Sequence, residues 1–177
     1  IIAFGSFMNE NLALVIALGF AIFKVFRPNF IVQNFSELFI YAGLAALFVP
    51  VLNLWSISIL LIVISLYDMW AVWKTKHMVK LANFQTESNL FAGIHLPYGE
   101  KKVAIIGGGD IGFPLLFSGV ILRTYGLTNA LIVSAIITLS LATLLFYSKK
   151  NKFYPAMPFL TAGCFIGYIL VIILQNI

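Results

Sequence analysis

The chain has 177 residues, of which 62% are apolar and 10% are charged, and its formal net charge is +5. Soluble domains are about 45–50% apolar and about 25% charged, so this composition excludes a soluble fold. Uninterrupted apolar runs without period-two alternation favour helices over a transmembrane barrel. The single cysteine, Cys164, excludes an intrachain disulfide and a thiolate metal cluster. We therefore predict an all-α, polytopic membrane helix bundle.

The apolar inventory predicts six spans in this chain, because one membrane-spanning helix needs about 20 mostly apolar residues. In chain order, the apolar runs are 12–27, 36–53, 54–73, 102–123, 128–147 and 155–175. Residues 1–8 are typical of the end of a further span, and we expect more spans upstream because the chain opens with Ile1. The one sizeable polar loop is 74–101.

The basic residues test this topology, because successive spans must alternate in direction. All but one of the eleven fall on one side of the predicted bundle: Lys24, Arg27, Lys74, Lys76, Lys80, Lys101, Lys102, Lys149, Lys150 and Lys152. Only Arg123 is predicted on the opposite side. The positive-inside rule therefore makes the basic side cytoplasmic and places the C-terminus outside.

The two aspartates, Asp68 and Asp110, both lie inside apolar runs, whereas the glutamates lie near predicted helix ends or in loops. An ionisable side chain at membrane depth is costly and marks function, although it can also pair with a cation or join two helices. Asp68 precedes Lys74 by six residues and Asp110 follows Lys102 by eight. At about 1.5 Å per residue, they lie about 9 and 12 Å inside the same border.

Two carboxylates at equal depth on neighbouring antiparallel helices form a general acid–base pair. Two such groups a few ångströms apart do not both ionise easily, so the pair holds one proton. The ionised member can accept a proton from a water attacking a peptide carbonyl, while the protonated member donates to the carbonyl oxygen. A proton relay uses the same pair, so the aspartates alone leave hydrolysis and proton-coupled transport open.

Three motifs surround the aspartates, at Tyr67, at Gly107, Gly108 and Gly109, and at Pro155, Ala156 and Met157. The phenol is placed to hydrogen-bond the neighbouring carboxylate or a substrate. The three glycines, predicted within a helix, indicate close approach of another backbone. The prolines that open the last predicted helix leave backbone acceptors without nearby donors, which suits pairing with an extended peptide.

Tyr-Asp in one helix, Gly-x-Gly-Asp in the next and Pro-Ala-x at the start of the last resemble the presenilin and signal peptide peptidase family, where these motifs occur in this order. The resemblance covers the whole chain and implies spans four to nine of a nine-span GxGD intramembrane aspartyl protease. The small size and short loops are most similar to archaeal presenilin homologues. Asp68 and Asp110 would be the catalytic pair, and Met157 stands where the family has leucine.

The resemblance also implies one transmembrane protease domain over 1–177. Within it, 1–80 would belong to the N-terminal half, 81–101 would be a cytoplasmic loop, and 102–177 would be the C-terminal half. The implied partners are transmembrane helices of substrate proteins and the lipid bilayer. No nucleic acid, cofactor, metal or obligatory subunit is implied, and homo-oligomerisation is left open. The implied location is an integral, multi-pass one, in the cell membrane if the source is prokaryotic.

Two rivals stay open. Prepilin and preflagellin peptidases also use a Gly-x-Gly-Asp aspartate, but they lack the Pro-Ala-Leu element. A proton- or ion-coupled transporter or a cation leak channel would use the same aspartates, although the sequence shows none of the internal repeats typical of transporters. Zinc and serine proteases are disfavoured, because neither His-Glu-x-x-His nor Gly-x-Ser-x-Gly occurs and the two histidines lie in the long loop.

Overall fold

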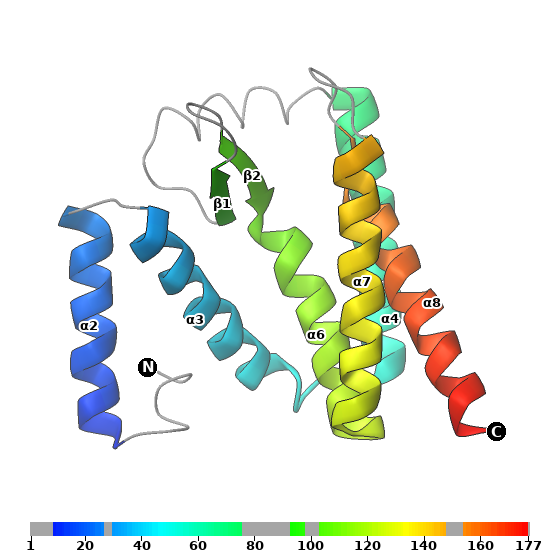
Figure 1. Ribbon diagram of the computed structural model, residues 1–177, viewed down its shortest axis with the longest axis horizontal. Helices are drawn as coiled ribbons and strands as arrows, with labels where there is room; N and C mark the ends of the chain where they lie inside the picture. Colours follow the sequence, from blue (N-terminus) through cyan, green and yellow to red (C-terminus); the bar gives the residue numbers. More distant parts are fainter. Residues whose placement is uncertain (1–8, 27–29, 76–92, 98–102, 148–153, 177) are drawn as a thin grey trace.

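The computed structural model describes residues 9–26, 30–75, 93–97, 103–147 and 154–176 (Figure 1). The α-helices in this part of the chain are α2 (Glu10–Phe26), α3 (Phe30–Phe48), α4 (Leu54–Trp70), α6 (Gly108–Tyr125), α7 (Leu127–Tyr147) and α8 (Met157–Gln175). A π-helical turn, η1 (Ala71–Thr75), continues α4, and strands β1 (Gly93–Pro97) and β2 (Val103–Gly107) precede α6. The six predicted helices are therefore confirmed, with boundaries shifted by a few residues.

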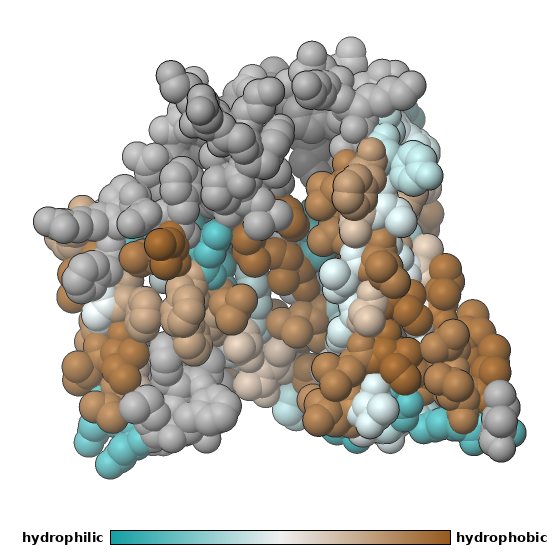
Figure 2. Space-filling model, viewed as in Figure 1, coloured by the Kyte–Doolittle hydropathy of each residue, from teal (hydrophilic) through white to brown (hydrophobic). Residues whose placement is uncertain are grey.

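Among the described residues, four helical segments are long and apolar enough to cross a membrane: Ile31–Phe48, Leu54–Lys74, Leu127–Tyr147 and Met157–Gln175. Large apolar side chains cover the outer faces of these helices, as the brown surface over α7 and α8 in Figure 2 shows. In water such a surface would be unfavourable, whereas lipid tails accommodate it. The chain is therefore an integral membrane helix bundle, as its composition predicts.

The core of the bundle lies between α4, α6, α7 and α8. Its largest fully buried side chains are Phe117, Ile57, Leu61, Ile121 and Leu160. Residue Phe117 of α6 meets Phe165 of α8 edge to face, with ring centroids 6.2 Å apart. This geometry is favoured between aromatic rings and holds α6 against α8.

Helices α7 and α8 approach closely because α8 has glycines where it faces α7. A Cβ atom on Gly163 would lie 2.5 Å from Ser140 Oγ, and one on Gly167 would lie 3.1 Å from Val133 Cα. Small residues four positions apart are typical of such contacts in membranes, where close van der Waals packing replaces the hydrophobic effect. The two helices thus form a tightly packed pair against which α4 lies.

The reversal between α3 and α4 is fixed at both of its ends. The Asn53 side chain accepts a hydrogen bond from Ser56 N–H at 2.8 Å and caps α4. Arg123 donates to the carbonyl oxygens of Val49, Pro50 and Leu52 at 2.7–2.8 Å. The one basic residue predicted on the opposite side therefore serves as a cap for the end of α3.

The hairpin is the main departure from the predicted fold. The sequence predicts a helix from residue 102, but β2 pairs antiparallel with β1, with Gly93 opposite Gly107, and α6 begins only at Gly108. A short apolar run such as 103–106 does not distinguish a strand from a helix by its pattern. Strand β1 lies within the predicted loop 81–101, whereas 81–92, 98–101 and residues 1–8 lie outside the described residues.

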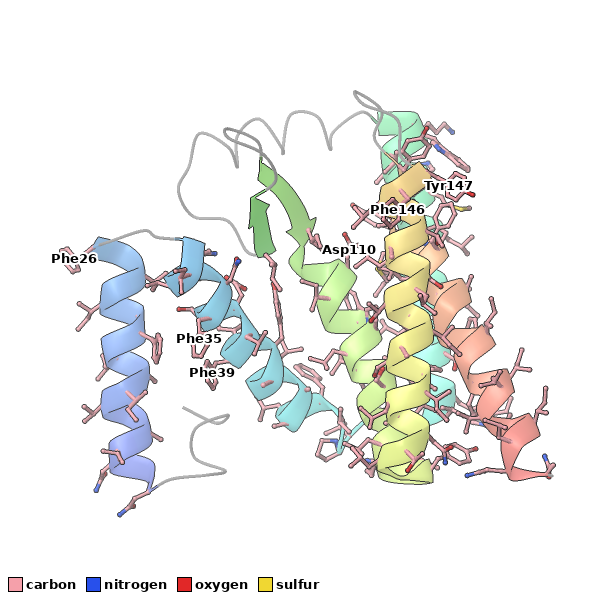
Figure 3. All side chains as sticks on the ribbon, in the orientation of Figure 1. Phe26, Phe35, Phe39, Asp110, Phe146 and Tyr147 are labelled. Atoms are coloured by element: carbon pink, nitrogen blue, oxygen red, sulfur yellow. The ribbon has the colours of Figure 1, made fainter. Side chains whose placement is uncertain are left out.

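Helix α3 carries a buried acid that the sequence places near a helix end. Because α3 begins at Phe30 and not at 36, Glu37 lies inside it and is 2% exposed. The Lys24 ammonium of α2 lies 2.8 Å from the Glu37 carboxylate, and the Gln33 amide donates to the same oxygen at 3.2 Å. Phe35 and Phe39 of α3, labelled in Figure 3, both lie against the ring of Phe20 on α2, with ring centroids 6.0 and 6.1 Å from it. An ion pair and aromatic contacts thus join α2 to α3.

Candidate active site

Asp68 lies near the end of α4, on the side that faces α8. Its side chain is 8% exposed, and Oδ2 accepts a hydrogen bond from the backbone N–H of Met157 at 3.0 Å. The backbone N–H of Ala156, the N-cap residue of α8, interacts with the same carboxylate. The first N–H groups of a helix have no partner within that helix, and the helix dipole favours negative charge there. The start of α8 is therefore a binding site for the Asp68 carboxylate.

Asp110 lies in the first turn of α6, directly after β2 (Figure 3). Gly107 is the N-cap residue of this helix, so Asp110 occupies the third helical position. From that position an acidic side chain reaches back to the N–H of the N-cap residue, as in a capping box. Its carboxylate indeed accepts from the Gly107 backbone. The first turn of its own helix thus binds Asp110.

Gly107 lies close to the Asp110 carboxylate. A Cβ atom on Gly107 would lie 3.3 Å from Asp110 Oδ2, closer than such atoms normally approach. Gly109 is less restricted, because its Cβ would make an ordinary contact with the Phe113 ring at 3.5 Å. The prediction that Gly107 lies within a helix is wrong, since it ends β2, while Gly108 and Gly109 begin α6. The close approach that Gly107 permits is made by Asp110 itself.

Asp68 and Asp110 lie on neighbouring helices, because α4 and α6 pack against each other. Asp68 lies near enough to Asp110 for its negative charge to act on the Asp110 carboxyl group. A pair of this kind shares a proton, so one member can accept a proton while the other donates one.

A comparison with protein families agrees with this geometry. The model of a family described as signal-peptide peptidase, presenilin aspartyl protease matches residues 1–101, which is more than half of the chain. The chain belongs to this family. The match with the signal peptide peptidase and presenilin family includes Asp68 and ends before Asp110. No curated protein matches the chain.

The Tyr67 side chain of this family member turns away from the aspartates. It is 65% exposed, and its ring lies 6.3 Å from that of Trp70. Its hydroxyl forms no hydrogen bond with Asp68 in the structure. Successive residues of an α-helix are rotated by about 100°, so a buried Asp68 directs its neighbour outward. The predicted contact between the phenol and the carboxylate is therefore absent, and the rings of Tyr67 and Trp70 remain exposed.

The Pro-Ala-Met segment, by contrast, lies directly at the site. Pro155 is buried, Met157 is 4% exposed, and Ala156 lies between them at the N-cap position. The sequence predicts that the backbone of this segment pairs with an extended substrate peptide. In the structure the N–H of Met157 is already bound by Asp68. The backbone of this segment thus binds one of the two aspartates directly.

Sequence reasoning missed a buried hydroxyl pair beside Asp68. Ser65 Oγ lies 2.6 Å from Thr161 Oγ1, and both side chains are buried. The available signal was spacing, because Ser65 precedes Asp68 by three residues and Thr161 follows Met157 by four. Residues three and four apart share one helix face.

The described residues offer no metal site. No group of three or more histidine, cysteine, aspartate or glutamate side chains occurs among them. The chemistry available at this site is that of two carboxylates and the backbone N–H groups that bind them.

Proposed function

We propose that this chain is an intramembrane aspartyl endopeptidase, which hydrolyses peptide bonds within the transmembrane segments of membrane proteins. The observation that carries the proposal is the meeting of Asp68 and Asp110 inside a membrane helix bundle, each at a helix N-terminus. An acid at this depth marks function, and two that share a proton form a general acid–base pair. Membership of the signal peptide peptidase and presenilin family supports the same chemistry.

The proposed reaction needs only the two carboxylates and one water. The ionised aspartate accepts a proton from water as the oxygen bonds to the peptide carbonyl carbon, and the protonated aspartate donates to the carbonyl oxygen. The tetrahedral intermediate then breaks its C–N bond: the leaving amine takes a proton from one aspartate, and a hydroxyl of the intermediate gives its proton to the other as the new carboxyl group forms. One water is consumed, one carboxyl and one amino terminus form, and the dyad regains its single proton.

The substrate must be unwound before this reaction, since a helix keeps every peptide bond within its own hydrogen bonds. Strand β2 supports a way of presenting it. One edge of β2 pairs with β1, and the strand ends at Gly107, three residues before Asp110. An extended segment added to the other edge would run toward the dyad. We assign strand pairing with substrate to β2, and the binding of Asp68 to the Pro-Ala-Met segment.

The basic residues support the proposed location and partners. We place the ends of the helices that carry the aspartates on the cytoplasmic side of the membrane, because the positive charge of the sequence concentrates there. The partners proposed are transmembrane helices of substrate proteins and the surrounding bilayer.

Cleavage of a transmembrane peptide tests the proposal. The full-length protein in lipid nanodiscs is incubated with a panel of single-span peptides, and mass spectrometry locates each cut. Asp68→Asn and Asp110→Asn keep the size of the side chain and remove the acid, so we expect each to abolish cleavage. Glu37→Gln removes a buried acid outside the site and can still accept from Lys24, so it is the matched control.

Each outcome decides between the candidate functions. Cuts within the apolar segment that vanish in both Asn variants, and persist in Glu37→Gln, support the two-aspartate protease. Cuts outside the apolar segment favour a peptidase of the prepilin type. A folded protein that cuts none of the panel, or Asn variants that cut as well as the wild type, overturns the protease and favours a transporter or channel.

A further inference from the structure

A buried polar contact lies one helical turn from the hydrogen bond between Asp68 and α8. Ser65 Oγ of α4 and Thr161 Oγ1 of α8 are 2.6 Å apart, and the two residues are 8% and 6% exposed. They lie beside apolar side chains such as Leu61 and Leu160, which are fully buried. A hydroxyl in such surroundings is costly unless it finds a partner, so the two groups depend on each other.

The spacing along both helices places this contact in register with the dyad. Ser65 precedes Asp68 by three residues on α4, and Thr161 follows Met157 by four on α8. Asp68 Oδ2 accepts from Met157 N–H at 3.0 Å. Since α4 runs toward the site and α8 runs away from it, the two contacts are successive rungs between the same helix faces.

One arrangement of this pair satisfies both hydroxyl donors. Each hydroxyl has one donor, and Thr161 Oγ1 also faces the Leu61 carbonyl oxygen at 3.5 Å. If Thr161 donates to that carbonyl, Ser65 donates to Thr161, and both donors are satisfied. Apolar neighbours keep their contacts when a helix slides by part of a turn, whereas these directional bonds hold only in one register.

The position of Asp68 depends on that register. The glycines of α8 fix it against α7, so α8 is a rigid reference for α4. The bonds to Asp68 from Met157 and Ala156 converge on one carboxylate, so they do not by themselves prevent α4 from turning about that point. A second directional contact one turn away fixes both the height and the rotation of α4.

We propose that Ser65 and Thr161 are positioning residues of the dyad: their hydroxyl pair holds α4 in the register that keeps the Asp68 carboxylate on the N-terminus of α8. This inference rests on the proposed protease function. Neither hydroxyl touches the reacting atoms, so their effect passes through Asp68. Loss of the pair is expected to slow the chemical step while substrate binding continues.

The test uses variants that change the hydroxyl and little else. Thr161→Val keeps the side-chain volume without the hydroxyl, Thr161→Ser keeps the hydroxyl, and Ser65→Ala removes its partner. Thr138→Val is the matched control, because Thr138 is exposed on α7 and bonds only to the Ser134 carbonyl of its own helix. For each protein, kcat and KM for a transmembrane peptide and the midpoint of thermal unfolding are measured in nanodiscs.

We expect Thr161→Val to lower kcat by roughly 10- to 100-fold, because a displacement of about 1 Å in a reacting group costs about that much. Its KM should stay near that of the wild type, and Thr161→Ser should restore kcat. The double variant Ser65→Ala/Thr161→Val should be no slower than Thr161→Val, which leaves one buried hydroxyl unpaired.

Three results would overturn the inference. The first is a wild-type kcat in Thr161→Val. The second is an equal loss in Thr161→Ser, or a fall in kcat that merely follows the unfolding midpoint, either of which makes the residues structural. The third is a folded wild-type protein that cleaves nothing, which is recognisable as failure of the proposed function and removes the catalytic role of the pair with it.

Discussion

The two aspartates are bound in the same chemical way but by different parts of the chain. Asp110 lies three residues from Gly107, its N-cap partner, within the first turn of one helix. Asp68 accepts from Met157, which lies 89 residues further along the chain. The environment of Asp110 is therefore local, whereas that of Asp68 exists only when α8 packs against α4. Disturbing the packing of α8 should affect Asp68 first.

The first and largest effect predicted for this comparison is that of Met157→Pro. Proline fits the first position of a helix but has no N–H, so Asp68 loses the donor at 3.0 Å and keeps only the Ala156 N–H. We expect kcat to fall by about 100-fold or more. Met157→Leu controls for the side chain, and Phe159→Pro places proline elsewhere in the same first turn; both should keep most activity. Near-normal cleavage by Met157→Pro would show that Asp68 does not need this N–H.

Gly107→Ala should disturb the local site by a smaller amount. The new Cβ would lie 3.3 Å from Asp110 Oδ2, so the carboxylate must move by a few tenths of an ångström. We expect kcat to fall by about tenfold. Gly112→Ala, in the helix that Gly107 precedes, is the matched control, because its Cβ would meet nothing within 4 Å. Equal activities of the two variants would contradict the close contact between Gly107 and Asp110.

Gly163→Ala tests whether the α7–α8 contact supports Asp68 from a distance. Its Cβ would lie 2.5 Å from Ser140 Oγ, so the helices must separate or the serine must turn away. We expect the free energy of unfolding to fall by about 1–3 kcal/mol, with a modest loss of kcat. Gly19→Ala on α2, whose Cβ meets nothing within 4 Å, should leave both unchanged or stabilise the helix. Denaturant titration in detergent would measure this difference, and its absence would contradict tight α7–α8 packing.

The smallest effect is expected for Tyr67→Phe. Its hydroxyl makes no bond to Asp68 and its ring is 65% exposed, so kcat should change by no more than about twofold. Tyr67→Ala, which also removes the ring that lies beside Trp70, shows what this aromatic contact contributes. A tenfold loss in Tyr67→Phe would place the phenol on the substrate or the dyad after all.

The features predictable from sequence are those that depend on composition and helical spacing. Apolar runs define helices because a span must be long and apolar, and the boundaries of α4 and α7 fall within a few residues of prediction. The sequence also places Asp68 and Asp110 on neighbouring antiparallel helices, and α4 and α6 do pack against each other. The residue count from Lys102 to Asp110 assumed helical rise, which does not apply to the strand Val103–Gly107.

The features that sequence did not reveal depend on particular three-dimensional contacts. Nothing in the run 103–106 separates a strand from a helix, so the role of Gly107 as an N-cap stayed hidden. The bond from Met157 to Asp68 and the Ser65–Thr161 pair both need the register of α4 on α8, which no local pattern specifies. The early start of α3 concealed that Glu37 is a buried acid.

The hydrogen bonds of Arg123 bear on how the chain becomes oriented as it enters a bilayer. Basic residues in short loops tend to keep those loops on the cytoplasmic side of the membrane. Arg123 is predicted on the opposite side from the other ten basic residues, so its charge favours the reverse orientation. In the folded chain its guanidinium lies on three carbonyl oxygens at the end of α3, where the helix dipole is negative. Packing of α3, α4 and α6 therefore provides acceptors for the one cation whose position runs against the topology that the other ten basic residues favour.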